Sequence, residues 1–534
     1  MQARNERSAG RQDRRLRTKQ SYQRKPETGP LRSVLYVLLV VALAGCGLVG
    51  ANSGGGEVVS PAVAPTQPGV GATPTLSATP TSPPPTPVPS PTLTLLSGRP
   101  SLGDPFTPEL GNTGYDVHHY DLKLALNPAL SRIEGVVAIE AETAEDNLRQ
   151  ISLDFIGYEI AFVMVEEEPA NFRREGGKLW VEFPQPFMSA GTPFTMAVAY
   201  AGQPVQEDSP YIHYTDYLGL VFLENSTFYT ISEPDGARYW FPCNDHPLDK
   251  ATFRSEFTVP QGLAVLGNGQ LVNSWLSEMP DGSEGATFVW EHEQPMATYL
   301  ALAAGGHYRR EEGEAPNGIP LIYYFFPELE EEYLEAVDVT PEVMVWLSEM
   351  LGPYPFESYG QATYYAMGIS MEMQTMTLLS YQMLDERTVV HEMSHSWFGN
   401  WVGIDTWGDT WWKEGLATYM EVLWLSRDDP AERERLMAEI GTDVAERGQD
   451  YPLDQPPRER IMSFDSYYRG AQFMYGLHQE VGDDAFFSGL RAFLSRNGGG
   501  NAGAEALLGA MEEAAGRELD AFFAQWLSAE LARE

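Results

Sequence analysis

The hydrophobic pattern of this chain changes near residue 306, and the change limits the folds that it can adopt. From about 113 to 305, apolar residues repeatedly alternate with polar ones, as in Tyr120, Leu122, Leu124 and Leu126. Such alternation indicates strands with one buried face. Beyond 306 the pattern becomes helical, starting with an expected helix over 328–351. We therefore predict an α+β fold, with an antiparallel β sandwich or saddle domain over 106–305 and a mainly helical domain over 306–534.

The first 45 residues have the layout of an export signal. Residues 1 to 32 carry ten Arg or Lys against three acidic residues, and an apolar run over 34–43 follows. This run is shorter than the roughly 20 apolar residues of a membrane span, and it leads into Leu-Ala-Gly-Cys at 43–46, which resembles a bacterial lipobox. We interpret 1–45 as a lipoprotein signal peptide whose cleavage leaves a lipidated Cys46. The alternative is an uncleaved helix in which Cys46 is a bystander.

Residues 46–105 are dominated by Pro, Thr, Ser, Gly, Ala and Val. Such a composition cannot bury a core, so we predict a semi-extended linker with a reach of at least about 40 Å. The folded body would then stand away from a bacterial membrane or envelope, outside the cytoplasm, to which the lipid anchors it. The membrane is thus one expected partner.

The charge of the chain argues against a nucleic-acid ligand. There are 35 basic and 75 acidic residues, which gives a formal net charge of −40. Removing residues 1–45, which carry ten basic and three acidic residues, would make the remainder more acidic still. Because a phosphate backbone needs a basic surface, we expect no nucleic-acid partner.

The segment that carries chemistry is His-Glu-x-x-His at residues 391–395. On a helix, positions i and i+4 share a face, so His391 and His395 can bind one zinc ion with Glu392 beside it. Catalytic zinc sites of this kind use two His and one carboxylate and keep a position for water. Glu414, nineteen residues after His395 on an expected following helix, fits the third ligand. We therefore predict one Zn²⁺ per chain.

Glu421 follows Glu414 by seven residues, which is two turns along the same helical face. It could accept a hydrogen bond from the outer N–H of a ligand histidine, as the carboxylates around metal sites do. The alternative is an ordinary solvated charge on the helix.

His-Glu-x-x-His, eighteen intervening residues and a Glu resemble the gluzincin family of membrane alanyl aminopeptidases and leukotriene hydrolase. Further segments are similar to motifs of that family, namely 232–247, Lys250 to Phe253, Met371-Glu372 and Tyr467-Tyr468-Arg469-Gly470. The resemblance covers about residues 115 to 480. It implies that 306–534 is a thermolysin-like zinc peptidase domain with a short helical C-terminal end, without the large helical domain that many members add.

The resemblance also implies the roles of the site residues. The two histidines and Glu414 would bind zinc, and Glu392 would be the general base. Tyr467 would stabilise the oxyanion, although Tyr468 could face the zinc instead. Glu233 and Glu372 would hold the free amine of the substrate, so the expected partners are peptides with a free N-terminus.

The function that follows is a zinc-dependent aminopeptidase. Two departures from the family's pattern leave a zinc endopeptidase as an alternative: Met373 stands where the family has Asn, and Ile231 where it often has Gln. A third hypothesis is a catalytically silent surface-binding lipoprotein, because enzyme folds are reused for binding.

We expect Cys46 to be the site of lipid attachment. Metabolic labelling with a radioactive fatty acid should label the wild-type protein, whereas Cys46→Ser should lose the label because it removes the acceptor sulfur. Equal labelling of both proteins would contradict the lipobox interpretation.

Overall fold

The computed structural model describes residues 94–205, 209–212, 218–329, 331–365, 368–447 and 451–527. The chain divides into two compact units, Met1–Val88 and Pro89–Glu534, and the described residues all belong to the second. The predicted signal peptide, Cys46 and most of the predicted linker lie outside the described residues. Within the described ranges, no helix is both long enough and apolar enough to cross a membrane.

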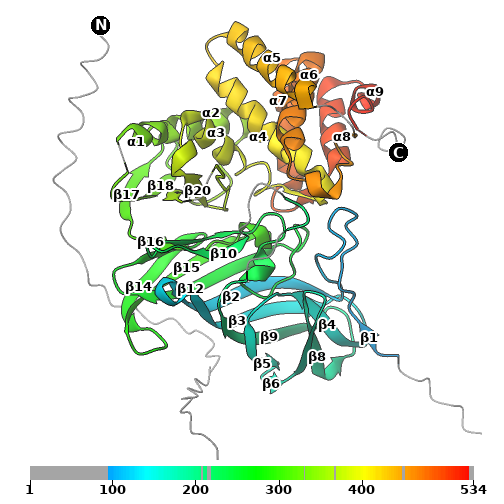
Figure 1. Cartoon of the computed structure of the whole chain (residues 1–534). Helices are drawn as coiled ribbons and strands as arrows, with labels where there is room; N and C mark the ends of the chain where they lie inside the picture. Colours follow the sequence, from blue (N-terminus) through cyan, green and yellow to red (C-terminus); the bar gives the residue numbers. More distant parts are fainter. Residues whose placement is uncertain are drawn as a thin grey trace, which may run out of the picture. The chain divides into compact units, whose positions relative to one another are not determined.

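The N-terminal domain is built on an eight-stranded sheet with the order β14-β15-β12-β2-β3-β9-β5-β6 (Figure 1). Its strands are β2 (Tyr115–Asn127), β3 (Arg132–Thr143), β5 (Glu159–Val165), β6 (Glu168–Pro169), β9 (Pro193–Gly202), β12 (Ala251–Pro260), β14 (Gln270–Glu278) and β15 (Glu284–Met296). All neighbouring pairs are antiparallel except β12 and β2. The alternating residues that predicted a strand lie on β2 and are at most 2% exposed, which confirms the pattern.

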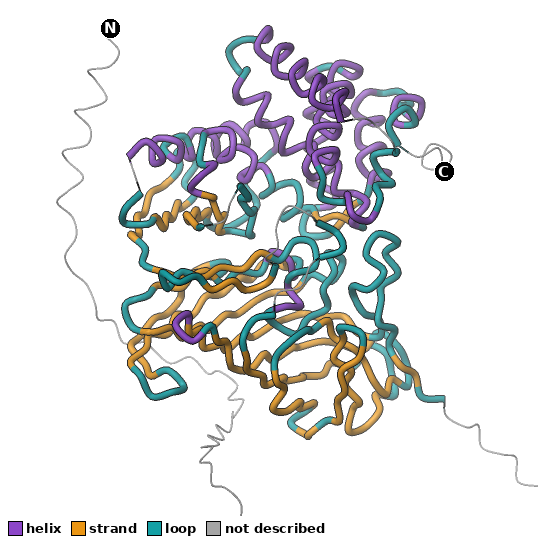
Figure 2. Tube along the Cα trace, in the orientation of Figure 1, coloured by secondary structure: helices purple, strands orange, loops and turns teal. Residues whose placement is uncertain are grey.

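Two smaller sheets complete this domain. The first has the order β1-β4-β8-β7 and contains β1 (Leu96–Ser97), β4 (Leu148–Asp154), β7 (Asn171–Glu175) and β8 (Lys178–Phe187). The second has the order β10-β11-β16-β13 and contains β10 (Gly219–Phe222), β11 (Phe228–Ile231), β13 (Ala264–Leu266) and β16 (Ala304–Gly306). Strands thus dominate up to β16, and helices dominate from α1 onward (Figure 2).

The second domain contains a four-stranded sheet that the sequence pattern did not predict. Its order is β17-β18-β19-β20, made of β17 (Arg309–Glu314), β18 (Pro320–Phe325), β19 (Tyr359–Tyr364) and β20 (Met376–Ser380). Every residue of β19 and β20 is buried. Strands that are buried on both faces lack the period-two pattern, which is why they escaped detection.

The helices of the second domain are α1 (Glu331–Val337), α2 (Thr340–Leu351), α3 (Glu386–Ser394), α4 (Thr410–Leu425), α5 (Pro430–Arg447), α6 (Gly470–Val481), α7 (Asp483–Asn497), α8 (Ala504–Ala515) and α9 (Asp520–Phe523). The single helix expected over 328–351 is therefore two helices, α1 and α2. A turn separates them, and Pro341 in the first turn of α2 starts the second helix because proline has no N–H to leave unpaired there.

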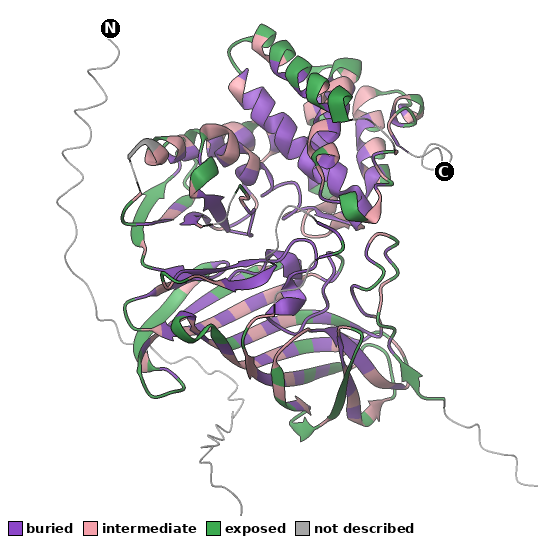
Figure 3. Ribbon diagram, viewed as in Figure 1, coloured by how far each residue is buried: buried purple, intermediate pink, exposed green. Residues whose placement is uncertain are grey.

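Helices α3 and α4 lie at the centre of the site described next. Asp385 caps α3, accepting a hydrogen bond of 2.8 Å from the backbone N–H of Thr388. Residues 410 to 424 of α4 are all buried, and Figure 3 shows this burial along the helix while α5 exposes its outer face. A helix that is buried on every side can carry polar residues only where they are paired.

The folded body begins earlier than the predicted linker boundary at residue 105. Strand β1 already pairs with β4, and residues 98–113, the strap, pack on both domains. Asp104 in the strap is 5% exposed; its Oδ2 lies 3.2 Å from His246 Nε2 and accepts a hydrogen bond of 3.0 Å from Trp407 N. The composition of the strap resembles a linker, but long-range contacts bury part of it, including Asp104, Thr107 and Leu110.

Candidate active site

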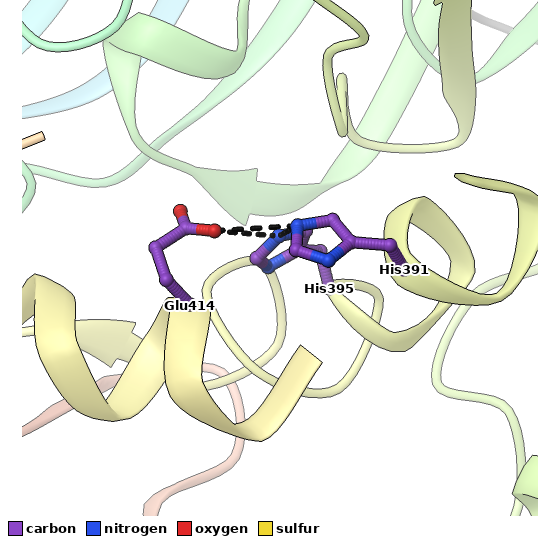
Figure 4. A group of neighbouring side chains, drawn as sticks. All are labelled: His391, His395 and Glu414. Carbon is purple, nitrogen blue, oxygen red and sulfur yellow. Dashed lines mark hydrogen bonds and ion pairs between the residues drawn. The ribbon is translucent and has the colours of Figure 1, made fainter. Parts of the chain in front are cut away.

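The three predicted metal ligands converge (Figure 4). The Nε2 atoms of His391 and His395 lie 3.1 Å apart, and they lie 3.3 Å and 3.4 Å from Glu414 Oε2. The His391 side chain is 12% exposed, and the other two are at most 2% exposed. Helix α3 carries His391, His395 follows its last residue, and α4 supplies Glu414.

The outer ring nitrogens of both histidines are already engaged. His391 Nδ1 lies 2.6 Å from Glu421 Oε1, and His395 Nδ1 lies 3.0 Å from the carbonyl oxygen of Phe398. Since both acceptors engage an N–H at Nδ1, the Nε2 atoms of the neutral imidazoles would offer their lone pairs to a metal at the centre of the cluster. The carboxylate of Glu421 therefore lies at the ring of His391, as the helical spacing suggested.

This donor set fits a zinc ion. Two imidazole nitrogens and one carboxylate oxygen face one point, and Glu414 Oε2 receives no hydrogen bond from the described residues. Burial alone would lower the pKa of His391, but the carboxylates of Glu414 and Glu421 raise it well above its ordinary value. The cluster therefore attracts positive charge, and its ligand types are those of catalytic zinc sites.

Glu392 lies beside the cluster with 6% exposure. Burial raises the pKa of Glu392 to about 8; His391 opposes the rise, and Glu372 adds to it. A carboxyl group in such surroundings holds a proton near neutral pH, as a group that must take up and release protons requires. A dication bound next to it would favour the ionised form.

Tyr467 and Tyr468 lie in different surroundings. Residues Asp465–Arg469 form a π-helical turn, which has more residues per turn than an α-helix and so redirects its side chains. The ring of Tyr467 stacks on His391, with centroids 5.8 Å apart and an interplanar angle of 17°. The ring of Tyr468 instead packs against Phe464 at 5.7 Å. Tyr467 is therefore the tyrosine that adjoins a predicted metal ligand.

Glu233 and Glu372 meet at a lysine that sequence analysis had not singled out. Lys413 Nζ lies 2.5 Å from Glu233 Oε1, 2.5 Å from Glu372 Oε1 and 2.9 Å from Glu414 Oε1. The lysine side chain is 0% exposed, and the two glutamates are 4–5% exposed. The ring of Tyr299 lies 5.5 Å from the ammonium nitrogen.

The electrostatics of this group follow from one cation shared by three carboxylates. Burial alone would lower the pKa of Lys413, but Glu233 and Glu372 raise it well above its ordinary value. Burial and the neighbouring Glu372 raise the pKa of Glu233. The ammonium instead lowers the pKa of Glu372 and Glu414 against the effect of burial. The signal in the sequence was the single lysine of α4, which follows two tryptophans, since a buried lysine requires a carboxylate partner.

The two departures from the family's pattern lie in the core. Ile231 ends β11 and is 2% exposed, and Met373 is 1% exposed. Neither offers a polar side chain near Glu233 or Glu372. The backbone of Glu372 is held in another way, because Asn400 Nδ2 donates a hydrogen bond of 2.7 Å to the carbonyl oxygen of Glu372.

Comparison with known families agrees with this geometry. Residues 340–526 match the model of the peptidase family M1 domain, and residues 117–300 match the peptidase M1 N-terminal domain. The chain belongs to peptidase family M1. This membership confirms both the gluzincin resemblance and the predicted order of a β-rich domain followed by a helical catalytic domain.

The alignment with this chain covers a different share of each M1 relative. It is 26% identical to aminopeptidase N of Lactococcus lactis over 445 residues, which cover 77% of this chain and 50% of that protein. It is 28% identical to aminopeptidase N of Streptomyces lividans over 339 residues, covering 57% and 38%. The chain therefore spans half or less of these relatives.

Solved two-domain M1 structures match over nearly their whole length. The M1 zinc metallopeptidase of Deinococcus radiodurans is 28% identical and superposes with a TM-score of 0.73, covering 80% of this chain and 96% of that protein. A mutant of the same peptidase, solved with the substrate Tyr-Ser-Ala, superposes equally well.

Replacing Lys413 by methionine should destabilise this M1 chain. Among the described residues, Lys413 is the Lys or Arg that pairs with these three buried carboxylates, and breaking a buried pair in this way costs about 3–5 kcal/mol of unfolding free energy. Urea denaturation in the presence of a chelator measures the loss without a contribution from metal.

Lys123→Met is a matched control, because that lysine side chain is 42% exposed and its loss should cost less than about 1 kcal/mol. Equal unfolding midpoints for the two variants would show that the shared ion pair does not stabilise the fold.

Proposed function

We propose that this chain is a zinc-dependent aminopeptidase that hydrolyses the N-terminal peptide bond of peptides. The observation that carries the proposal is that Glu233 and Glu372 each place a carboxylate oxygen within 4.8 Å of Glu414, a candidate metal ligand. The α-ammonium of a peptide lies only two bonds from the carbonyl carbon of its first residue. Carboxylates that can bind this ammonium group next to a metal centre therefore suit an exopeptidase.

The chemistry divides between the metal and the side chains of the chain. Bound zinc lowers the pKa of a water molecule toward 7 and polarises the scissile carbonyl. Glu392, buried beside the ligands, takes a proton from the attacking water and delivers it to the leaving amine. His391, His395 and Glu414 would hold the metal, and Glu421 would fix the ring of His391.

Tyr467 is suited to stabilise the developing oxyanion. Its ring lies against His391, so the phenol is carried at the edge of the metal centre. A positioned hydrogen-bond donor of this type contributes on the order of 10²–10³ in rate. Tyr468, which packs on Phe464, is not needed for this role.

Charge balance supports binding of a free N-terminus. When ionised, Glu233, Glu372, Glu392 and Glu414 carry four negative charges. Zinc supplies two positive charges, Lys413 supplies one, and the α-ammonium of the substrate supplies the fourth. A substrate with a blocked amine leaves one buried negative charge without a partner, which is costly where water is limited.

The M1 relatives support the proposal of an aminopeptidase. Two of them bear the name aminopeptidase N, and a two-domain peptidase of similar fold was solved with the tripeptide Tyr-Ser-Ala. Peptides with a free N-terminus are therefore the proposed partners.

One observation favours a zinc endopeptidase instead. Lys413 already pairs with both Glu233 and Glu372, so the carboxylates that would hold an amine have a cation of their own. A catalytically silent binding protein is disfavoured, because a complete set of metal ligands and an adjoining general base are present.

We also propose, from sequence alone, that the enzyme is held outside the cytoplasm on the bacterial membrane or envelope by a lipid on Cys46. The Pro-, Thr- and Ser-rich linker would then let the catalytic body reach peptides away from the membrane surface.

The metal assignment predicts that one substitution loses bound zinc and that another loses hydrolysis. His391→Ala should lose most bound zinc because it removes one of three ligands, whereas Glu392→Gln should keep zinc and lose hydrolysis because Glu392 moves a proton. Metal analysis and turnover of the same preparations separate the two. Full zinc content in His391→Ala, or substantial turnover by Glu392→Gln, would overturn the respective role.

The exopeptidase assignment predicts discrimination between free and blocked substrates. An aminoacyl amide should be cleaved at least about 10²-fold better than its acetylated form, which corresponds to roughly 3 kcal/mol of transition-state stabilisation. Glu372→Ala should erase most of that difference, because it removes one of the two amine anchors.

Glu342→Ala, a change at an exposed position of α2, is the control and should keep the discrimination. Equal cleavage of free and blocked substrates by the wild-type enzyme, or earlier cleavage of internal bonds in long peptides, would favour the endopeptidase instead.

A further inference from the structure

Arg387 is linked to the metal cluster through one intermediate side chain. It lies on α3 one helical turn before His391, and its Nε lies 2.5 Å from Glu421 Oε2. The other oxygen of the same carboxylate lies 2.6 Å from His391 Nδ1. Arg387, Glu421 and His391 thus form a continuous chain of charge-assisted hydrogen bonds that ends at a candidate metal ligand.

The two histidines are held in different ways. His395 Nδ1 lies 3.0 Å from the backbone carbonyl of Phe398, a neutral acceptor fixed by the chain itself. His391 instead depends on Glu421, a carboxylate at the end of a flexible side chain from α4. The orientation of His391 therefore requires something that fixes the carboxylate of Glu421.

Arg387 supplies that restraint. The Glu421 side chain is 9% exposed, so its carboxylate has little access to water and needs a cation or hydrogen-bond donors. Among the residues that the structure describes, Arg387 is the only Arg or Lys that pairs with it. The contact joins α3, which carries His391, to α4, which carries Glu414.

We propose that Arg387 is a positioning residue of the metal centre, which fixes the carboxylate of Glu421 and through it orients His391 for binding zinc. The inference rests on the zinc site of the proposed function. It assigns Arg387 no contact with substrate or with the reacting atoms.

Zinc affinity is the direct readout. Loss of a residue that orients a ligand typically costs 10–100-fold in metal affinity, and because the Arg387 side chain is 40% exposed we expect about tenfold weaker zinc binding for Arg387→Met. Competition with a chelator of known affinity measures this without substrate. Arg387→Lys, which keeps a cation within reach of Glu421, should recover part of the loss.

Arg435→Met is the matched control. Arg435 is an exposed arginine on α5 that pairs with Glu432 and Glu439, and its replacement should leave zinc affinity within about twofold of wild type. With zinc at saturation, Arg387→Met should keep the wild-type KM, because Arg387 contacts neither of the amine anchors.

A double variant separates positioning from a general effect on the fold. If Arg387 acts through Glu421, adding Arg387→Met to Glu421→Gln should weaken zinc binding by less than about twofold further. Zinc affinity of Arg387→Met equal to that of Arg435→Met, or losses that simply multiply in the double variant, would overturn the proposal. Failure of the wild-type protein to bind zinc would instead refute the proposed metal site.

Discussion

The site depends on one buried ammonium group shared by three carboxylates. Lys413 on α4 pairs with Glu233 from the β-rich domain, with Glu372 from the segment between β19 and β20, and with Glu414 beside it. Without this cation, three negative charges would lie together in a place with little water, an arrangement that low dielectric strongly disfavours. The pairing therefore fixes where Glu233 and Glu372, the proposed amine anchors, lie relative to Glu414, the predicted metal ligand. It also makes the site a product of both domains, because neither one alone supplies all four side chains.

The predicted ligands are held both by the helices that carry them and by hydrogen bonds to the outer nitrogens of the histidine rings. Burial of α4 on every side leaves Glu414 little freedom, and α3 with its C-terminal cap places His391 and His395 one turn apart. Around them, the carbonyl of Phe398 and the carboxylate of Glu421 engage the outer ring nitrogens. Fixing the tautomer and the direction of each ring before a metal arrives reduces the cost of ordering the ligands. The strap adds a more distant restraint, since Asp104 accepts a hydrogen bond from Trp407, close to the start of α4.

The local parts of the site were predictable because helical spacing is set by the backbone alone. His391, Glu392 and His395 lie together whenever that segment is a helix, and Glu421 falls two turns after Glu414 by the same rule. Family resemblance added Glu233, Glu372 and Tyr467, which no local pattern could have brought together. The half-buried strands of the first domain were likewise visible, since residues such as those of β2 face the core at every second position.

By itself, then, the sequence determined the His-Glu-x-x-His spacing, the order of the two domains and the strands with one buried face, all of which follow from short-range periodicity. Only the tertiary structure decided that Lys413 bridges Glu233 and Glu372, that Tyr467 rather than Tyr468 lies against His391, and that the strap belongs to the folded body. It also revealed the sheet of β17 to β20, whose buried strands carry no alternating signal. These features arise from contacts between residues far apart in the chain, so their energies depend on packing and burial that no local pattern contains.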